Sequence, residues 1–562
     1  MISKNFISLY EESFRKYWEH PALSNYEGAT YTYQSLAHQI AQWHITFKEL
    51  SLEPQDKIAI MAKDTAEWCI AFLASITYGA VIVPVLQDFA PADAMSIIDH
   101  SEAKLLYINH DLWQQFDPAA IPQVRSVIDL QTAEPLYDRR GIEPLREALQ
   151  ARLGLRFSDF SREDVRYYHT PNSELLLLNY TSGTTGYSKG VMVSANNMAG
   201  NVSFCMGKGI VSPHERLLCF LPLAHTYSCM INIQLALAQG VHVILLGKAP
   251  TPTILRRALA DIKPRIVVSV PLIIEKIYHN AIAPIISTPK VRLMLSIPLV
   301  RNLVYRKIKT RLIEGLGGAA DEIIVGGAAL NPEIGRFLKR IGFPITVGYG
   351  MTECAPLISY CPPREWRLGS CGQVLEGFMQ ARIAPLEGEH DMSQSKSYSK
   401  GHALPVGEIQ VRGENVCLGY YKNEEHTQAL FTEDGWLRTG DLGSMDADNF
   451  LYIKGRSKAM LLSGNGQNIY PEEIESKISM IPYVLESLVV MRRGRLEAII
   501  VPNTQAIASA GIGEEEAWEV IADHRAMLND QLGSYEKVQR FERRDEPFEK
   551  TPKMSIKRFL YK

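Results

Sequence analysis

The sequence predicts an α/β protein whose mainly parallel sheets are covered by helices, followed by a smaller antiparallel β unit and a small α+β unit. Three observations support this prediction. Short β-branched or leucine-rich runs alternate with longer helical patterns up to residue 368. Short strands separated by turn pairs follow Gly369, and the C-terminal part mixes one long helical stretch with short strands. The 562 residues leave room for three to four domain-sized units.

Seven short apolar runs predict the buried strands of the parallel sheets. They are KIAIMA (57–62), KLLYIN (104–109), SVIDL (126–130), ELLLLNY (174–180), VHVILL (241–246), RIVVSV (265–270) and EIIVGG (322–327). In the later units, GEIQVRG (407–413) predicts an antiparallel strand and residues 513–532 predict a helix. The polar segment 388–403 is predicted to be a surface loop.

Composition and targeting signals indicate a protein of the reducing cytoplasm. The net charge of −3 provides no overall positive potential that would attract nucleic acid, so no nucleic-acid partner is expected. The eight cysteines show no CxxC spacing, which predicts neither a zinc site nor a disulfide framework. The uncharged stretch 68–87 could span a bilayer, but Gly79 and Pro84 divide it into a helix and a strand, Val81 to Val85, of a soluble fold.

The strongest functional motif lies between Glu174 and Asn197. A four-leucine strand runs into TSGTTGYSKG (181–190), where glycines, hydroxyls and a lysine can converge on an anion. The motif is not a Walker A loop, because Ser188 and Gly190 stand where that pattern needs Gly and Ser or Thr. The residues predicted to bind a polyphosphate are Thr181, Ser182, Gly183, Thr184, Thr185, Gly186 and Lys189.

In this motif the chain resembles the adenylate-forming (AMP-binding) enzymes, a superfamily that includes acyl-CoA synthetases, peptide-synthetase adenylation domains and firefly-type luciferases. The resemblance continues in the expected order through LPLAHTYS (221–228), VGGAAL (325–330), VGYGMTE (347–353), GWLRTGD (435–441) and GRSKAMLLSGNGQNIYPEEIE (455–475). VRGENVCLGYYKN (411–423) and the insert between about 276 and 316 resemble the long-chain fatty acid-CoA ligases.

The resemblance implies a fold and a reaction. The fold is a large domain over 1–456, with two α/β subdomains over about 1–368 and a β-barrel-like subdomain over 369–456, followed by a mobile lid over 457–562. The reaction activates a medium- or long-chain fatty acid with ATP and Mg²⁺ to acyl-AMP, and then transfers the acyl group to the thiol of coenzyme A. Fatty acid, ATP and coenzyme A are therefore the expected small-molecule substrates.

The resemblance also assigns roles to individual residues. Tyr349 would stack on adenine, Thr352 would donate to the α-phosphate, and Glu353 would hold Mg²⁺ through a hard carboxylate oxygen. Asp441 would accept hydrogen bonds from the ribose hydroxyls, with Arg456 beside it. The remaining expected positions are Gly326, Gly327, Ala328, Gly350 and Met351 around the nucleotide, Lys458 as the hinge, and Gly464 near the pantetheine channel.

The acyl site is expected to be apolar. LLCFLPLAHTYSCMIN (217–232) contains no acid, whereas an amino acid substrate would need a carboxylate near its ammonium group. His225 resembles the family histidine beside the substrate carboxylate, and the alternative interpretation is a hydrogen-bonded core histidine. Residues 276–313 carry eight Lys or Arg, no Asp or Glu, and the apolar patch MLSIPLV (294–300). This segment is either a peripheral contact with anionic lipid at the inner membrane face or a solvated helix pair.

One departure from the family pattern concerns the expected catalytic lysine. Where a pattern like TPTxKxKR is expected, residues 551–558 read TPKMSIKR, so that Ser555 occupies the lysine position. A lysine would neutralise the charge that develops during adenylation, and serine cannot. Three interpretations stay open: an active fatty acid-CoA ligase, a catalytically impaired relative that binds nucleotide and acyl groups, and another acyl-adenylate-forming ligase.

We expect Ser555→Lys to raise acyl-dependent ATP–pyrophosphate exchange strongly, because it restores the missing positive charge at the adenylation step. The coenzyme A half-reaction, started from a synthetic acyl-adenylate, should change much less. A wild-type chain that already exchanges fast and gains nothing from the substitution would show that this C-terminal alignment is wrong.

Overall fold

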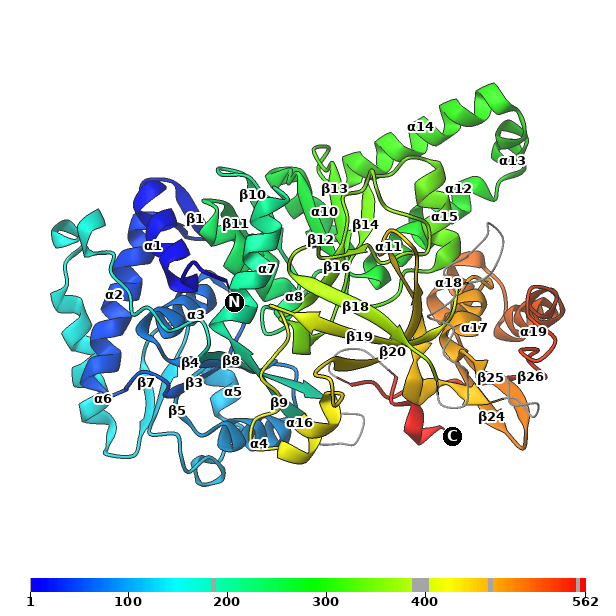
Figure 1. Cartoon of the computed structure of the whole chain (residues 1–562). Coiled ribbons are helices and arrows are strands. Elements are labelled where there is room, and N and C mark those ends of the chain that lie inside the picture. Colours follow the sequence, from blue (N-terminus) through cyan, green and yellow to red (C-terminus); the bar gives the residue numbers. More distant parts are fainter. Residues whose placement is uncertain (1, 183–187, 387–403, 463–467, 552–555, 562) are drawn as a thin grey trace.

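A seven-stranded sheet forms the first α/β unit of the chain (Figure 1). The structure is a computed structural model that describes residues 2–182, 188–386, 404–462, 468–551 and 556–561. The sheet has the order β7-β6-β5-β3-β4-β8-β9, in which the five central strands are parallel and the two edge strands antiparallel. The strands are β3 (Lys57–Met61), β4 (Val81–Pro84), β5 (Ala103–Ile108), β6 (Ser126–Asp129), β7 (Pro135–Asp138), β8 (Leu175–Ser182) and β9 (Ser188–Ser194).

Strand alternation buries both faces of this sheet. In β3, Ile58 and Ile60 join one hydrophobic cluster, whereas Ala59 and Met61 join another on the opposite face. The covering helices are α2 (Tyr33–Glu49), α3 (Ala66–Tyr78), α4 (Pro91–Ser101), α5 (His110–Trp113) and α6 (Ile142–Ala151). Helix α3 is buried along most of its length and ends at Gly79, whose φ of +89° suits a left-handed cap. The predicted division of 68–87 into a helix and a strand is therefore confirmed. Among the described residues, no helix is both long and apolar enough to span a bilayer.

Two further sheets form the second α/β unit. One has the order β10-β11-β1-β2 and the other the order β12-β13-β14, with all strands parallel except β2. All seven runs predicted as buried strands are strands of these three sheets. The bounds are β1 (Pro21–Asn25), β2 (Thr30–Thr32), β10 (Arg216–Cys219), β11 (His242–Leu245), β12 (Ile266–Ser269), β13 (Glu322–Val325) and β14 (Ile345–Val347). The helices around them are α1 (Phe6–Lys16), α7 (Ala195–Gly207), α8 (Thr226–Cys229), α9 (Ala236–Ala238), α10 (Pro252–Ile262), α11 (Pro271–Ile277), α12 (Ala283–Ile286) and α15 (Pro332–Arg340).

The basic insert forms a helical hairpin that stands out from the body at the upper right of Figure 1. Helix α13 (Pro289–Ser296) turns at Ile297 into the longer helix α14 (Pro298–Gly315). No side chain of α13 is buried, and Ile308 is the buried residue of α14 among its described side chains. The hairpin is therefore attached to the body through the second half of α14.

Antiparallel sheets follow β14, and they begin earlier than the predicted start at Gly369. Strands β15 (Tyr349–Gly350), β16 (Leu357–Tyr360) and β17 (Gln373–Val374) form one sheet, of which β15 and β16 precede that residue. The other has the order β18-β19-β20-β21, with the bounds β18 (Met379–Ala384), β19 (Gly407–Gly413), β20 (Leu437–Met445) and β21 (Leu451–Arg456). The predicted strand 407–413 is confirmed, and helix α16 (Glu424–Leu430) lies between β19 and β20. The predicted surface loop 388–403 lies outside the described residues.

The C-terminal unit is built on the sheet β24-β25-β26, at the lower right of Figure 1. One face packs against α17 and α19, and the other packs against Phe548, Ile556 and Tyr561 near the end of the chain. The predicted helix over 513–532 is confirmed as α19. The bounds are β22 (Leu461–Leu462), β23 (Asn468–Ile469), α17 (Pro471–Ile478), β24 (Val484–Arg492), β25 (Arg495–Pro502), α18 (Thr504–Ala510), α19 (Glu514–Asp530) and β26 (Arg540–Arg543).

Two glycines between β16 and β17 give a matched test of backbone packing. Gly372 has a φ of +89°, and a Cβ there would lie 2.7 Å from the Cα of Tyr360, whereas Gly369 has a φ of +79° and open space around it. We expect Gly369→Ala to lower the free energy of unfolding by about 1 kcal/mol and Gly372→Ala by more than about 3 kcal/mol. Denaturant unfolding followed by tryptophan fluorescence measures both. Equal losses in the free energy of unfolding would show that the close approach to Tyr360 does not destabilise Gly372→Ala.

Candidate functional site

The phosphate-loop motif joins the last two strands of the seven-stranded sheet. In the β8–β9 ladder, Thr181 pairs with Lys189 and Ser182 pairs with Ser188, so both ends of the motif are fixed by strand pairing. The predicted residues Gly183, Thr184, Thr185 and Gly186 lie outside the described residues. Lys189 is therefore the second residue of β9 and follows closely after the segment that joins β8 to β9.

A short segment of the later antiparallel region covers β9. Met192 donates its backbone N–H to Gly419 O (2.9 Å), Leu418 donates to Met192 O (2.9 Å), and Tyr421 donates to Gly190 O (2.8 Å). These bonds bring the ring of Tyr420 within 5.1 Å of Lys189 Nζ, measured to the ring centroid. The contact is a cation–π interaction between residues more than two hundred positions apart.

Tyr420 links the lysine to the predicted magnesium ligand. Its hydroxyl donates to Glu353 Oε1 at 2.8 Å, and the backbone N–H of Cys417 donates to the carbonyl of Glu353 at 2.8 Å. Glu353 and its neighbour Thr352 are both buried in a 3₁₀ turn, Thr352–Cys354. Sequence analysis did not single out Tyr420, although it lies in the VRGENVCLGYYKN segment.

The predicted hinge residue Lys458 acts on Lys189 through its charge. Burial and the Lys458 ammonium lower the pKa of Lys189, while the Glu353 carboxylate opposes this shift. Lys458 lies in a 3₁₀ turn, Ser457–Ala459, directly after β21. The charge of the predicted hinge residue therefore acts on Lys189, which is connected to Glu353 through Tyr420.

A second buried carboxylate lies at the end of the β20–β21 ladder. Asp441 pairs in register with Arg456, whose Nε lies 2.8 Å from Asp441 Oδ1. Tyr349 donates its hydroxyl to Asp441 Oδ2 at 2.6 Å. Burial raises the pKa of Asp441, and Arg456 and Tyr349 oppose that shift, whereas the Glu353 carboxylate adds to it. Each oxygen of Asp441 thus has a donor, and Glu353 is close enough to act on it.

Tyr349 and its neighbours are closely packed. The Tyr349 ring is buried, and its hydroxyl is committed to Asp441. A Cβ on Gly350 would lie 2.1 Å from the carbonyl oxygen of Pro356, so this position of β15 needs glycine. The half-buried Met351 donates its backbone N–H to the same carbonyl at 2.9 Å. The motif VGYGMTE is therefore fixed against the strand that follows it.

The VGGAAL segment is held by a tyrosine from the LPLAHTYS motif. Tyr227 donates its hydroxyl to Ile324 O at 3.1 Å, and a Cβ on Gly326 would come within 3.1 Å of its ring. Gly327 has a φ of +86°, and Ala328 is exposed beside it. His225, partly buried, is the N-cap residue of α8, which carries Tyr227. Sequence analysis did not identify Tyr227, because its partner carbonyl belongs to β13.

Several contacts join the C-terminal unit to the body. Lys454 Nζ lies 2.7 Å from Glu473 Oε1, and Asn331 Nδ2 donates to Ser476 O at 2.6 Å. Inside the C-terminal unit, Arg558 near the end of the chain pairs with the carboxylate of Glu475 of α17. The predicted residues Gly464 and Ser555 lie outside the described residues.

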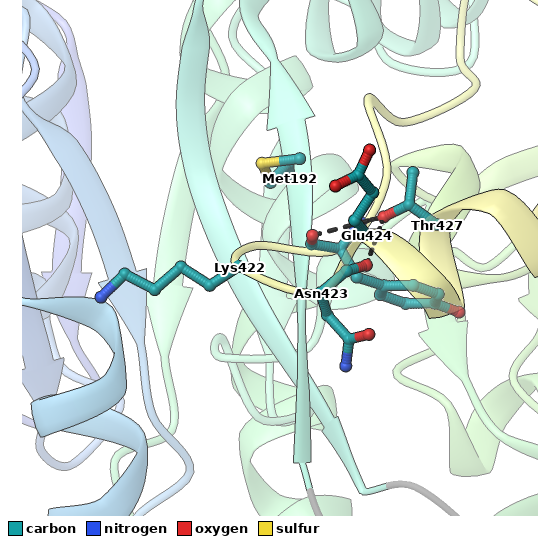
Figure 2. Close-up of a pocket in the computed structure, with 6 residues that line it drawn as sticks. Met192, Lys422, Asn423, Glu424 and Thr427 are labelled. Atoms are coloured by element: carbon teal, nitrogen blue, oxygen red, sulfur yellow. Dashed lines mark hydrogen bonds between the residues drawn. The ribbon is translucent and has the colours of Figure 1, made fainter.

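A surface hollow of about 450 Å³ is lined in part by the Tyr420 segment (Figure 2). Thr427 Oγ1 accepts the N–H of Tyr420 at 2.9 Å and donates to Asn423 O at 2.8 Å, while Lys422 extends away from these residues. The lining residues are Met192, Tyr420, Lys422, Asn423, Glu424 and Thr427. These bonds fix the turn that presents Tyr420 to Lys189 and Glu353.

The donor set suits a hard cation bound chiefly through phosphate. Among the described residues, no cluster of three or more His, Cys, Asp or Glu side chains could hold a metal alone. Glu353 is a single buried carboxylate beside Lys189, and Mg²⁺ in proteins commonly takes one or two carboxylates together with substrate phosphates and water. The residues present therefore fit a magnesium–nucleotide complex.

Comparison with known proteins points to one family. The pattern of the AMP-binding enzyme family matches residues 10–421. The chain is 28% identical over 488 residues to a long-chain-fatty-acid–CoA ligase of Mycobacterium tuberculosis, covering 81% of this chain and 74% of the relative. It is 26% identical over 521 residues to the long-chain-fatty-acid–CoA ligase ACSBG2 of Homo sapiens, covering 86% and 74%.

Solved structures show the same fold over almost the whole chain. The ATP-bound crystal structure of MatB from Rhodopseudomonas palustris has a TM-score of 0.75 at 22% identity, covering 99% of this chain and 98% of that chain. The o-succinylbenzoate coenzyme A synthetase MenE from Bacillus subtilis, in complex with ATP and magnesium ion, has a TM-score of 0.72 at 21% identity with the same coverage.

We expect Tyr349→Phe to lower the free energy of unfolding by about 1 to 3 kcal/mol, because it leaves a buried oxygen of Asp441 without its donor. Tyr452→Phe is the matched control. Its hydroxyl also donates to an aspartate, Asp446, but that carboxylate keeps Arg367 and backbone donors. Urea unfolding of both variants measures the difference. Equal losses would contradict the supporting role assigned to Tyr349.

Proposed function

The chain belongs to the AMP-binding enzyme family, and we propose that it is an AMP-forming acyl-CoA synthetase that activates a medium- or long-chain fatty acid. One observation carries the proposal: tyrosines connect a cation and two buried carboxylates from distant parts of the chain. Lys189 lies over the ring of Tyr420, which donates to Glu353, and Tyr349 of the same VGYGMTE motif as Glu353 donates to Asp441. The matches to long-chain-fatty-acid–CoA ligases support the acyl class.

The nucleotide would be held at both ends. Lys189 places positive charge beside the polyphosphate, and Thr352 donates to the α-phosphate. Asp441 accepts the ribose hydroxyls, since a carboxylate oxygen can accept a further hydrogen bond beside the one from Tyr349. Glu353 holds Mg²⁺, which when bound neutralises charge on the phosphate oxygens.

The reaction then proceeds in two displacements. A fatty acid carboxylate oxygen attacks the α-phosphorus of ATP, forming acyl-AMP and releasing pyrophosphate. The thiol sulfur of coenzyme A, after losing its proton, attacks the acyl carbonyl carbon and releases AMP. His225 lies beside the carboxylate in the first step. We propose that 457–562 acts as a lid that turns about Lys458 between the steps, and that Gly464 lines the pantetheine path.

We also propose that the enzyme works in the cytoplasm. All eight cysteines fall within the described residues, and each is buried and unpaired. This is typical of a reducing compartment.

Ser555 favours a second candidate, a relative that binds nucleotide and acyl groups but adenylates slowly. The two candidates differ in one measurement, the rate of the adenylation half-reaction. Both require the same nucleotide site.

We expect acyl-dependent ATP–pyrophosphate exchange to rise with chain length into the medium or long range and to fall roughly a hundredfold in Lys189→Met, which removes charge stabilisation at the phosphates. Lys422→Met is the matched control, because Lys422 pairs with Glu102 and extends away from Asn423 and Thr427 in Figure 2. The exchange is measured in the wild-type chain and in Ser555→Lys.

The outcomes separate the candidates. Exchange in the wild-type chain supports the active ligase, and exchange that needs Ser555→Lys supports the impaired relative. If neither chain exchanges with any fatty acid, or if Lys189→Met behaves like Lys422→Met, the proposed function is wrong.

We expect Asp441→Asn to weaken ATP binding about tenfold, equivalent to about 1.4 kcal/mol, because the amide breaks the ion pair with Arg456 and one acceptor is lost. Calorimetric titration with ATP and Mg²⁺ measures this. Tyr452→Phe should leave the affinity unchanged. An unchanged affinity in Asp441→Asn would remove Asp441 from the nucleotide site.

A further inference from the structure

The α13–α14 hairpin exposes apolar side chains at its free end. Around the turn at Ile297, the exposed fractions are 67% for Leu293, 46% for Ile297, 83% for Leu299 and 64% for Leu303. Four large apolar side chains so close together on a protruding structure are unusual for a surface that meets only water.

Charge is ordered along the hairpin relative to this tip. Within four residues of Ile297 on either side, Arg301 is the one charged residue. The cations gather farther from the turn on both arms, at Lys290 and Arg292 before it, and at Arg306, Lys307, Lys309 and Arg311 after it. Each arm therefore runs from cationic to apolar as it approaches the tip.

Within the part of the chain that the structure describes, these cations lack carboxylate partners. Among the described residues, no carboxylate forms an ion pair with any of the eight Lys or Arg side chains of 276–313. Elsewhere on the surface, cations such as Arg336 and Arg367 do have carboxylate partners. The hairpin thus presents a concentrated positive charge, and its one acid is Glu314 in the last turn of α14, far from the tip.

A small cationic hollow of about 290 Å³ lies between the cationic part of α14 and the end of α15. The side chains that line it are Asn302, Tyr305, Arg306, Lys309, Arg340 and Ile341. Three cations around one hollow, with amide and phenol groups beside them, are suited to a phosphate group.

We propose that the α13–α14 hairpin docks this enzyme on a bilayer that contains anionic phospholipid. The leucines of the tip enter the acyl region, the cations lie at headgroup depth, and the hollow at Arg306, Lys309 and Arg340 holds one lipid phosphate. This goes beyond the proposed function and does not depend on it.

The arrangement fits a bilayer better than an acidic protein. The apolar side chains are on a convex tip, and a fluid bilayer accepts a convex apolar object, whereas a folded partner would need a matching apolar recess. The separation of apolar and cationic zones along one axis also matches the change from acyl chains to phosphates with depth in a membrane. Such docking would bring the enzyme to the phase where long-chain fatty acids dissolve.

The test is co-sedimentation of the full chain with vesicles of phosphatidylcholine alone and of phosphatidylcholine with an equal part of phosphatidylglycerol. No nucleotide or fatty acid is present. We expect binding to the anionic vesicles only, weakened by added salt. Leu299→Ser/Leu303→Ser should reduce the partition coefficient at least about tenfold. Arg306→Gln/Lys309→Gln/Arg340→Gln should reduce it about fivefold per cation.

The controls carry changes of the same kind elsewhere, one leucine to serine and three cations to glutamine. Leu153 is 64% exposed and lies on the far side of the molecule after α6, so Leu153→Ser should bind like the wild-type chain. Arg493→Gln/Arg495→Gln/Lys537→Gln removes the same charge from exposed positions of the C-terminal unit. Thermal unfolding of every variant should match the wild-type chain, since the changed side chains are mostly exposed.

Three results would overturn the proposal. The wild-type chain could ignore anionic vesicles at low salt, the tip and cation variants could bind as well as the wild-type chain, or the controls could lose as much binding. Retention on immobilised polyglutamate without vesicle binding would instead assign the hairpin to an acidic protein. Exchange with a medium-chain acid in vesicle-free buffer tests the proposed function separately, so each proposal can fail alone.

Discussion

The burial of two carboxylates sets the position of everything around the site. Asp441 and Glu353 are nearly inaccessible to water, and a buried charge is tolerated only when other groups donate to it or pair with it. Asp441 accepts a hydrogen bond from Tyr349 and pairs with Arg456, and Glu353 accepts a hydrogen bond from Tyr420. These partners come from three segments of the chain, so satisfying the two acids fixes how those segments lie together.

The Asp441–Arg456 pair also stands at the exit from the body. It is the last register pair of the β20–β21 ladder, and the chain passes directly from Arg456 through Lys458 toward the C-terminal unit. Two further contacts join the same two parts of the chain. Lys454, two residues before Arg456, pairs with Glu473 of α17. Asn331 of the body donates to Ser476 of α17 and to Ser479, directly after that helix. A nucleotide at Asp441 would therefore touch the junction at which the proposed lid begins.

Sequence patterns predicted most of the fold, because strand length, turn residues and the change between helical and strand periodicity of apolar residues are local properties. The division of 68–87 at Gly79 and the strand 407–413 are examples. The roles of Tyr420 and Tyr227 were not predictable in this way, since each depends on a partner brought close by tertiary pairing. For Tyr349, the motif suggested a ring for stacking, and the structure adds a hydroxyl that serves Asp441. In the basic insert, composition showed the charge but not that the cations lack acidic partners among the residues that the structure describes.

The loop that covers β9 has one more effect. Strand β9 is the edge of the seven-stranded sheet, and an open edge offers unpaired backbone groups to strands of other chains. Three backbone hydrogen bonds from residues 418–421 occupy that edge over 190–192. The contacts that place the Tyr420 ring beside Lys189 thus also occupy part of this sheet edge, so that in the folded protein a strand of another chain cannot pair there.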